Sequence, residues 1–133
     1  MKKIPFLFLF TACISNAAFA EEENPSVIQQ QFKIICEGEK SFLKCEAGEQ
    51  LKIKRVFWGR DDFKECTHVP AGLTLERLCE ANSDNATQKV EGQCKNEQEC
   101  EIVASNIFFD DNSCGNVYKY LKVYSECLPT ENE

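Results

Sequence analysis

Cys114-Gly-Asn-Val-Tyr-Lys-Tyr-Leu-Lys-Val-Tyr-Ser-Glu-Cys127 is the stretch that says most about this chain. Residues 117–125 have the period-two alternation of a β-strand, and they predict the last and longest strand of the fold. Successive side chains of a strand point to opposite faces. We therefore expect Leu121 and Val123 to face the core with Val117. Three tyrosines would share the opposite face: Tyr118, Tyr120 and Tyr124.

The first twenty residues have the composition of a secretory signal peptide. Lys2 and Lys3 precede an apolar stretch over 4–14, and residues 18–20 form a small-x-small cleavage site. No later stretch approaches the roughly 20 apolar residues that span a bilayer. The sequence thus predicts a secreted, extracellular protein without a transmembrane segment. A bacterial lipoprotein box at 10–13, with Cys13 lipidated, is the alternative, which Phe10 and the better downstream cleavage site disfavour.

Cleavage after residue 20 would leave 113 residues, a length that suits one domain. Without Lys2 and Lys3, 13 basic residues face 22 acidic ones, a net charge of −9. This balance argues against a nucleic-acid partner, because phosphate binding needs clustered basic residues.

The cysteine count predicts a disulfide framework. Cys13 would leave with the signal, so eight of the nine cysteines remain. An even number in a small exported chain favours disulfides, each worth about 2–4 kcal/mol. Zinc binding is the alternative, but Cys94 and Cys100 lie too far apart for a C-x2-C pair. Neither a metal nor a cofactor is expected, and sequence pattern alone leaves the disulfide pairing open.

Short strands dominate the expected secondary structure. Residues 21–33 predict a flexible acidic leader, whose last residues begin a strand over 32–36; a strand over 41–45 would be its hairpin partner. A third strand is expected over 51–58 and another over 101–104. Residues 60–81 predict a long cross-linked loop with one helical turn at 73–78. Ser83 or Asp84 is expected to cap a short helix running toward Cys94.

Signs of catalysis are weak, and we expect no enzyme. His68 is the one histidine and has no nucleophile-elbow motif beside it. The adjacent acids Asp61-Asp62 and Asp110-Asp111 are typical of solvent-facing turns, although glycosidases use paired carboxylates. Asn85-Ala86-Thr87 is an acceptor motif for N-glycosylation, so the chain is a candidate glycoprotein.

Three short motifs contain groups that can hold a neutral sugar. They are Glu37 directly after a cysteine, Trp58-Gly59-Arg60, and Tyr118-Lys119-Tyr120. A carboxylate accepts from two neighbouring hydroxyls, an ammonium group donates to hydroxyl oxygens, and a tyrosine ring covers an apolar C–H face. The same residues also read as an ordinary turn, a strand end and an alternating strand. Their chemistry alone leaves both interpretations open.

The order of these motifs resembles the sea-urchin-egg-lectin (SUEL) type domain, also called the rhamnose- or galactose-binding lectin domain. Cys36-Glu37-Gly38, Phe57-Trp58-Gly59-Arg60 and the segment from Cys114 to Cys127 follow the family's order, and all eight cysteines have counterparts. The similarity runs from about residue 34 to 128 and would leave 129–133 as a C-terminal tail. It covers nearly the whole of the expected mature chain.

The resemblance implies an α+β fold: a small disulfide-rich antiparallel β-sandwich with one short helix and long cross-linked loops. It pairs Cys36 with Cys66, Cys45 with Cys127, Cys79 with Cys114, and Cys94 with Cys100. It also implies a non-catalytic lectin for rhamnose- or galactose-like sugars, with glycans or glycoproteins as partners. A single domain would need non-covalent homo-oligomerisation or a multivalent surface for avidity.

The resemblance places the sugar between Glu37 and Lys119, which would grip neighbouring hydroxyls. Asp111 or Asp110 corresponds to the family's aspartate, and Tyr118 with Asn116 in the 115–117 segment would shape the pocket wall. Phe57 replaces a usual asparagine, and Asn116-Val117 replaces a usual Gly-Thr. These departures support an alternative function, a protein-binding adhesion or defence module on the same framework. Pocket support would come from Trp58, Gly59 and Arg60.

Overall fold

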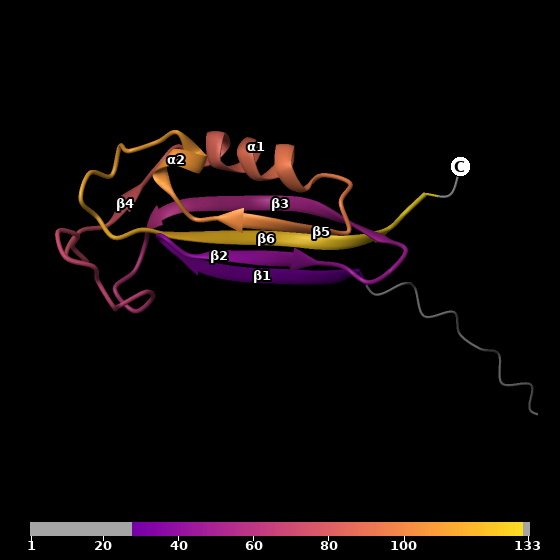
Figure 1. The fold of residues 1–133 in the computed structure, drawn as a ribbon, viewed down its shortest axis with the longest axis horizontal. Helices are drawn as coiled ribbons and strands as arrows, with labels where there is room; N and C mark the ends of the chain where they lie inside the picture. The colour runs from indigo at the N-terminus through magenta and orange to yellow at the C-terminus, as the bar shows by residue number, and fades with distance from the viewer. Residues whose placement is uncertain (1–27, 132–133) are drawn as a thin grey trace, which may run out of the picture.

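Two antiparallel sheets form the body of the protein (Figure 1). The computed structural model describes residues 28–131, so the expected signal peptide and most of the leader lie outside it. The larger sheet has the order β1 (Gln29–Cys36), β6 (Tyr120–Pro129), β3 (Glu49–Arg60) and β4 (Cys79–Glu80). The smaller sheet pairs β2 (Lys40–Lys44) with β5 (Glu99–Val103). The antiparallel α+β architecture expected from the sequence is confirmed.

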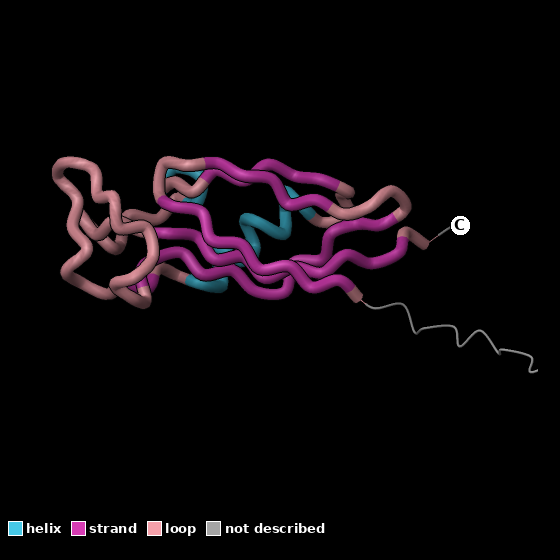
Figure 2. Tube along the Cα trace, turned by 90° about the horizontal axis from the view of Figure 1, so that it is seen from below, coloured by secondary structure: helices cyan, strands magenta, loops and turns pink. Residues whose placement is uncertain are grey.

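The sheets lie in two layers (Figure 2), and the helices run along one side of the strands (Figure 1). Helix α1 spans Ser83–Cys94 and packs mainly on β3, burying Ala86, Val90 and Cys94. Leu121 and Val123 of β6 and Val117 before it are fully buried, which confirms the expected core face. Within residues 28–131, no helix combines the length and apolar character needed to cross a bilayer.

Four disulfides tie these elements together with the pairing that the resemblance implies. They also exclude the zinc alternative, since all eight cysteines are occupied. Cys45–Cys127 joins the end of β2 to β6, so it links the two sheets and closes the longest loop. The other three join Cys36 to Cys66, Cys79 to Cys114, and Cys94 to Cys100.

The expected hairpin between the first two strands is wrong. Strand β1 begins at Gln29, inside the expected leader, and pairs with β6, whereas β2 pairs with β5. At the turn around Gly38 the chain leaves the larger sheet and enters the smaller one. Between β1 and β2, side-chain hydrogen bonds take the place of a backbone ladder. Lys33 Nζ donates to the Phe42 carbonyl at 2.6 Å, and Gln31 Nε2 donates to the Lys44 carbonyl at 2.6 Å.

Other local predictions also need correction. Asn82, not Ser83 or Asp84, caps α1 through its side chain, which accepts from the Asn85 N–H. The expected helical turn at 73–78 is absent from the described chain, because Thr74 instead bridges to Val117. A second helix, α2 (Asn106–Phe109), was not expected. It has only four residues, too few to produce a helical period in the sequence.

Of the three tyrosines expected to share one face, Tyr120 and Tyr124 lie on the face of β6 opposite Leu121 and Val123, whereas Tyr118 lies outside the strand. Strand β6 begins at Tyr120, so Tyr118 precedes it. The Tyr120 ring is buried, and its hydroxyl accepts the N–H groups of Asp61 and Asp62 at 2.8 and 3.0 Å. Burial raises the pKa of Tyr120, and its hydrogen bond to the Asp61 carboxylate raises the pKa further. Tyr120 therefore fixes the start of the loop after β3.

Candidate functional site

Glu37 and Lys119 meet at the end of the larger sheet where β1 finishes and β6 begins (Figure 1). The Glu37 N–H donates to the Lys119 carbonyl, and the Lys119 N–H donates to Glu37 Oε2, both at 2.9 Å. The first bond extends the β1–β6 ladder by one residue beyond Cys36, and the second joins the Glu37 side chain to the Lys119 backbone. The pairing of the strands thus brings together two residues that are distant in sequence.

Their side chains form an ion pair. Lys119 Nζ lies 3.0 Å from Glu37 Oε1, and it also donates to the Val117 carbonyl at 3.0 Å. The ammonium group is 5.5 Å from the centre of the Trp58 ring. The Lys119 side chain is 1% exposed and that of Glu37 is 15% exposed. Glu37 is therefore the more accessible partner, and the buried Lys119 side chain binds its carboxylate from the protein interior.

This geometry leaves hydrogen-bonding capacity for a ligand. A carboxylate has about four lone-pair directions, and two of those on Glu37 are occupied by Lys119. An ammonium group has three donors, of which Glu37 and Val117 take two. Glu37 can thus accept from two hydroxyls of a ligand. Lys119 can donate to a third oxygen of a ligand that reaches its ammonium group.

Tyr118 adds a neutral phenol beside these charges. Burial raises the pKa of Tyr118, and the nearby carboxylates of Glu39 and Glu37 raise it further. The hydroxyl consequently stays protonated and able to donate. The Tyr118 N–H donates to the Thr74 carbonyl at 2.8 Å, so the long loop after β3 holds this residue in place.

Asp111, one of the two candidates for the family's aspartate, is already engaged in hydrogen bonds. Its Oδ1 accepts from the Ser113 hydroxyl at 2.6 Å and N–H at 2.9 Å, and its Oδ2 accepts from the Asn82 N–H at 3.2 Å. The Ser113 bonds lower the pKa of Asp111, and the Lys119 charge contributes. Asp110 is exposed and ends α2 in a left-handed conformation. Asp111 thus joins its loop to the N-cap of α1, and the positive charge of Lys119 acts on its carboxylate.

Asn116 lies on the exposed turn before Val117. The positive φ of this segment falls at Gly115, with φ 58°, so Asn116 has no need to replace a glycine conformation. Its carbonyl accepts the Thr74 N–H at 2.9 Å. The side chain of Asn116 is exposed.

Trp58, Gly59 and Arg60, which the resemblance predicts as pocket support, are all buried. Trp58 stacks on Phe109 of α2, with 4.9 Å between the ring centres. At Gly59 a Cβ would lie 2.2 Å from the Cys79 carbonyl, because β4 pairs with β3 there. Sequence reasoning missed Phe109, since its four-residue helix left no pattern to find.

Phe57 lies on the other face of the larger sheet. Its neighbours in β3, Val56 and Trp58, are fully buried, whereas Phe57 is half-buried and its ring centre is 6.0 Å from that of Tyr120. It therefore does not line the cluster around Lys119, which contacts Trp58. Its replacement of asparagine leaves the Glu37–Lys119 geometry intact.

Asn85 of the glycosylation motif has a structural role in α1. Its Nδ2 donates to the Phe109 carbonyl at 2.8 Å and joins α1 to α2. We expect Asn85→Ala to lower the free energy of unfolding of the unglycosylated chain by about 1 kcal/mol, the net worth of one hydrogen bond. Urea denaturation would measure this change.

Thr87→Ala is the matched control, because it removes the same motif but keeps the Asn85–Phe109 bond. Its hydroxyl donates to the Ser83 carbonyl within the helix, a bond of little net value. Equal stability of Asn85→Ala and the wild type would contradict the structural role.

Comparison with known proteins supplies the remaining finding. Residues 43–127 match the model of the D-galactoside/L-rhamnose binding SUEL lectin domain. The chain is 33% identical over 98 residues to the L-rhamnose-binding lectin SML of Scomberomorus niphonius, covering 72% of this chain and 46% of that lectin. It is 29% identical over 101 residues to the adhesion G protein-coupled receptor L1 of Homo sapiens, covering 76% of this chain and 7% of the receptor. The chain thus spans less than half the length of either relative.

Proposed function

The chain belongs to the D-galactoside/L-rhamnose binding SUEL lectin domain family, and on that premise we propose that it is a secreted lectin which binds rhamnose- or galactose-like sugars without altering them. The observation that carries this proposal is the Glu37–Lys119 pair, with the Tyr118 phenol beside it. The Glu37 carboxylate would accept from two neighbouring hydroxyls, and the Lys119 ammonium would donate to one of their oxygens. Asp111 and Asn116 would border the sugar.

The proposed preference follows from the stereochemistry of the hydroxyls. L-rhamnose and D-galactose each have a cis pair of neighbouring ring hydroxyls, which brings both oxygens to one side of the ring. The C2, C3 and C4 hydroxyls of D-glucose include no such pair. Two hydroxyls on one side can reach the single Glu37 carboxylate together, so glucose should bind more weakly.

A single sugar should bind weakly, because it exchanges hydrogen bonds with water for bonds with protein at modest net gain. Tight binding to a glycoprotein would then need several sites acting together. We propose that the chain self-associates or acts on a multivalent glycan surface.

Ligand-observed NMR on the refolded chain 21–133 tests the proposal. We expect saturation transfer to L-rhamnose and D-galactose, little transfer to D-glucose, and loss of transfer in the variant E37Q/K119M. Lys40→Gln is the control, because Lys40 is exposed on β2 and should bind as the wild type does. Transfer that survives in E37Q/K119M would show that the sugar binds elsewhere.

A protein-binding module is the second candidate, favoured by the nearly complete burial of Lys119. A pair that stays closed would serve the fold and leave the surface for a protein partner. Competition separates the two functions. An excess of free L-rhamnose should abolish binding to a glycoprotein if the chain acts as a lectin, and should leave binding to a protein partner unchanged.

A further inference from the structure

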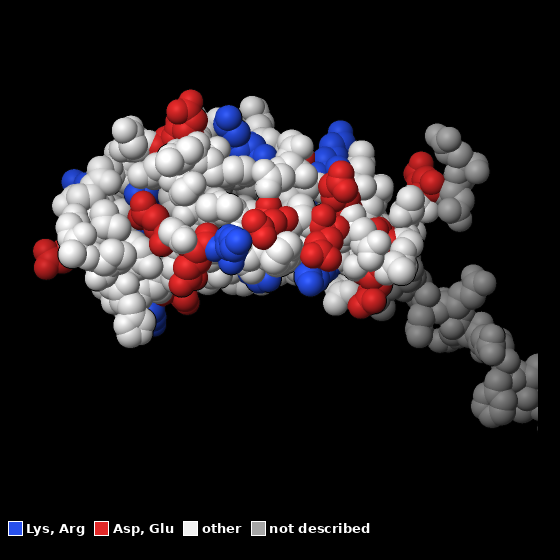
Figure 3. Space-filling view, viewed as in Figure 1, with Lys and Arg blue, Asp and Glu red and all other residues white. Residues whose placement is uncertain are grey.

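Positive charge is concentrated on β3. This strand has four of the chain's 15 basic residues and one acidic residue, whereas the whole chain has a net charge of −7. Leu51 and Ile53 of β3 face the core, so the strand alternation sends Lys52 to the outer face of the sheet. The β-bulge between Ile53 and Arg55 leaves both Lys54 and Arg55 exposed. On the face drawn in Figure 3, by contrast, acidic and basic side chains are scattered without forming a patch of one sign.

Aromatic rings lie beside these cations on the outer face. The Arg55 guanidinium is 4.6 Å from the centre of the Tyr124 ring, and that ring is 4.6 Å from the Phe32 ring in β1. Phe32 is 52% exposed. The outer face thus has a strip in which cations on β3 adjoin rings on β6 and β1.

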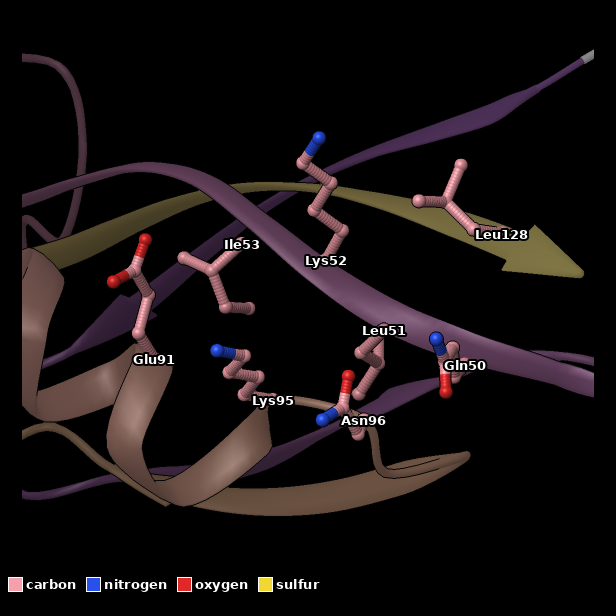
Figure 4. Close-up of a pocket in the computed structure, with 8 residues that line it drawn as sticks. All are labelled: Gln50, Leu51, Lys52, Ile53, Glu91, Lys95, Asn96 and Leu128. Atoms are coloured by element: carbon pink, nitrogen blue, oxygen red, sulfur yellow. The ribbon is translucent and has the colours of Figure 1, made fainter. Parts of the chain in front are cut away.

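A groove continues the strip around the edge of β3 to the side of the sheet on which α1 lies. A cavity of about 250 Å³ lies between β3 and the end of the helix, where Lys95 reaches from α1 toward Ile53 and Lys52 extends away from the helix (Figure 4). Among the described residues, neither lysine nor Arg55 takes part in an ion pair. Two carboxylates oppose this charge: Glu91 lines the same cavity, and Glu126 lies 3.6 Å from Lys54. Three cations of the strip therefore remain available to an anion.

We propose that this strip, formed by Lys52, Lys54, Arg55 and Lys95 with the rings of Tyr124 and Phe32, binds a sulfated polysaccharide. Sulfate oxygens would accept from the guanidinium and ammonium groups, and a planar guanidinium can offer two donors to one anionic group. The apolar C–H faces of the sugar rings would lie on the aromatic rings. This site is separate from the one around Glu37 and Lys119.

Two simpler explanations account for only part of the strip. Strand β3 lacks a β-partner on one side over residues 49–58, since β4 pairs only with Gly59 and Arg60, and lysines on such an edge prevent unwanted pairing. That explanation gives no role to the exposed rings. A second copy is also a poor fit, because antiparallel pairing of two β3 strands would place like charges opposite one another.

Binding of the full chain to an immobilised heparin-derived octasaccharide, and to its desulfated counterpart, tests the inference. We expect binding to the sulfated form alone, weakening as salt rises. The variant K52Q/K54Q/R55Q should lose about tenfold or more in affinity, because three of the charge contacts that displace counterions are removed. Phe32→Ser should weaken binding with less effect on the salt dependence.

The matched control is K40Q/K64Q/K89Q, which makes the same change in net charge at three exposed lysines outside the strip. An equal loss of affinity in this control would mean that binding depends only on net charge, and it would overturn the inference. Equal binding of the desulfated octasaccharide, or no binding at about 0.15 M salt, would overturn it as well. Displacement of the octasaccharide by L-rhamnose would place it at Glu37 and Lys119 instead, whereas failure of the rhamnose site alone would leave this result unchanged.

Discussion

Substitution of Arg60 by lysine is expected to lower the free energy of unfolding by about 3 kcal/mol, although charge and approximate length are kept. The Arg60 side chain is 1% exposed and donates to four carbonyls. Nε donates to Tyr118 at 2.6 Å, Nη1 donates to Asp62 and Glu65 at 3.0 and 2.8 Å, and Nη2 donates to Cys66 at 3.0 Å. A lysine has no fork of donors and would leave several of these carbonyls without partners. Urea denaturation with the disulfides intact would measure the loss.

Arg77→Lys provides the control for this prediction. Arg77 is exposed and its Nη2 donates to one carbonyl, that of Cys114, at 3.1 Å. We expect its replacement to change the free energy of unfolding by less than about 0.5 kcal/mol, as is usual at the surface. Similar losses in the two variants would mean that the carbonyl cluster around Arg60 contributes little.

Arg60 also shows how far the sequence could lead toward the site. The family resemblance predicts Trp58, Gly59 and Arg60 as pocket support, and in the structure Trp58 lies next to Lys119 and Arg60 donates to the Tyr118 carbonyl. It does not predict that Arg60 donates to backbone carbonyls, because three of the four carbonyls come from a loop without periodicity. Their positions depend on the Cys36–Cys66 disulfide and on Tyr120, neither of which is local to the motif.

The fold could be predicted where the sequence pattern of a single strand or helix is sufficient to identify it. The alternation around Leu121 and Val123 gave the core face of β6, and the polar start before Ala86 gave α1. The hairpin prediction failed because strand partners are chosen by tertiary packing. Residues 32–36 and 41–45 are close in sequence and joined by a turn. The first segment nevertheless pairs with β6 and the second with β5, where the ladders are longer or better buried.

The largest effect at the site itself should come from separating Glu37 from Lys119. Glu37→Gln is expected to lower the free energy of unfolding by about 3 kcal/mol, since it leaves a buried ammonium group without its counter-ion. Lys119→Met should cost less, about 1–2 kcal/mol, because the Glu37 carboxylate is partly exposed and keeps the Lys119 backbone N–H as a donor. The stability of both single variants and of E37Q/K119M can be measured by urea denaturation.

The double variant separates the structural role of the pair from its binding role. With neither charge present, no buried ion remains unpaired, so E37Q/K119M should be more stable than Glu37→Gln alone, with a coupling energy of about 2 kcal/mol. Its affinity for sugar should nevertheless stay lost, because no carboxylate and no ammonium group remain to meet the hydroxyls. Losses that simply add would mean that the two side chains act independently, contrary to the 3.0 Å contact between them. Recovered stability together with recovered sugar binding would instead show that the pair only supports the fold, and the binding site would have to be sought on another surface.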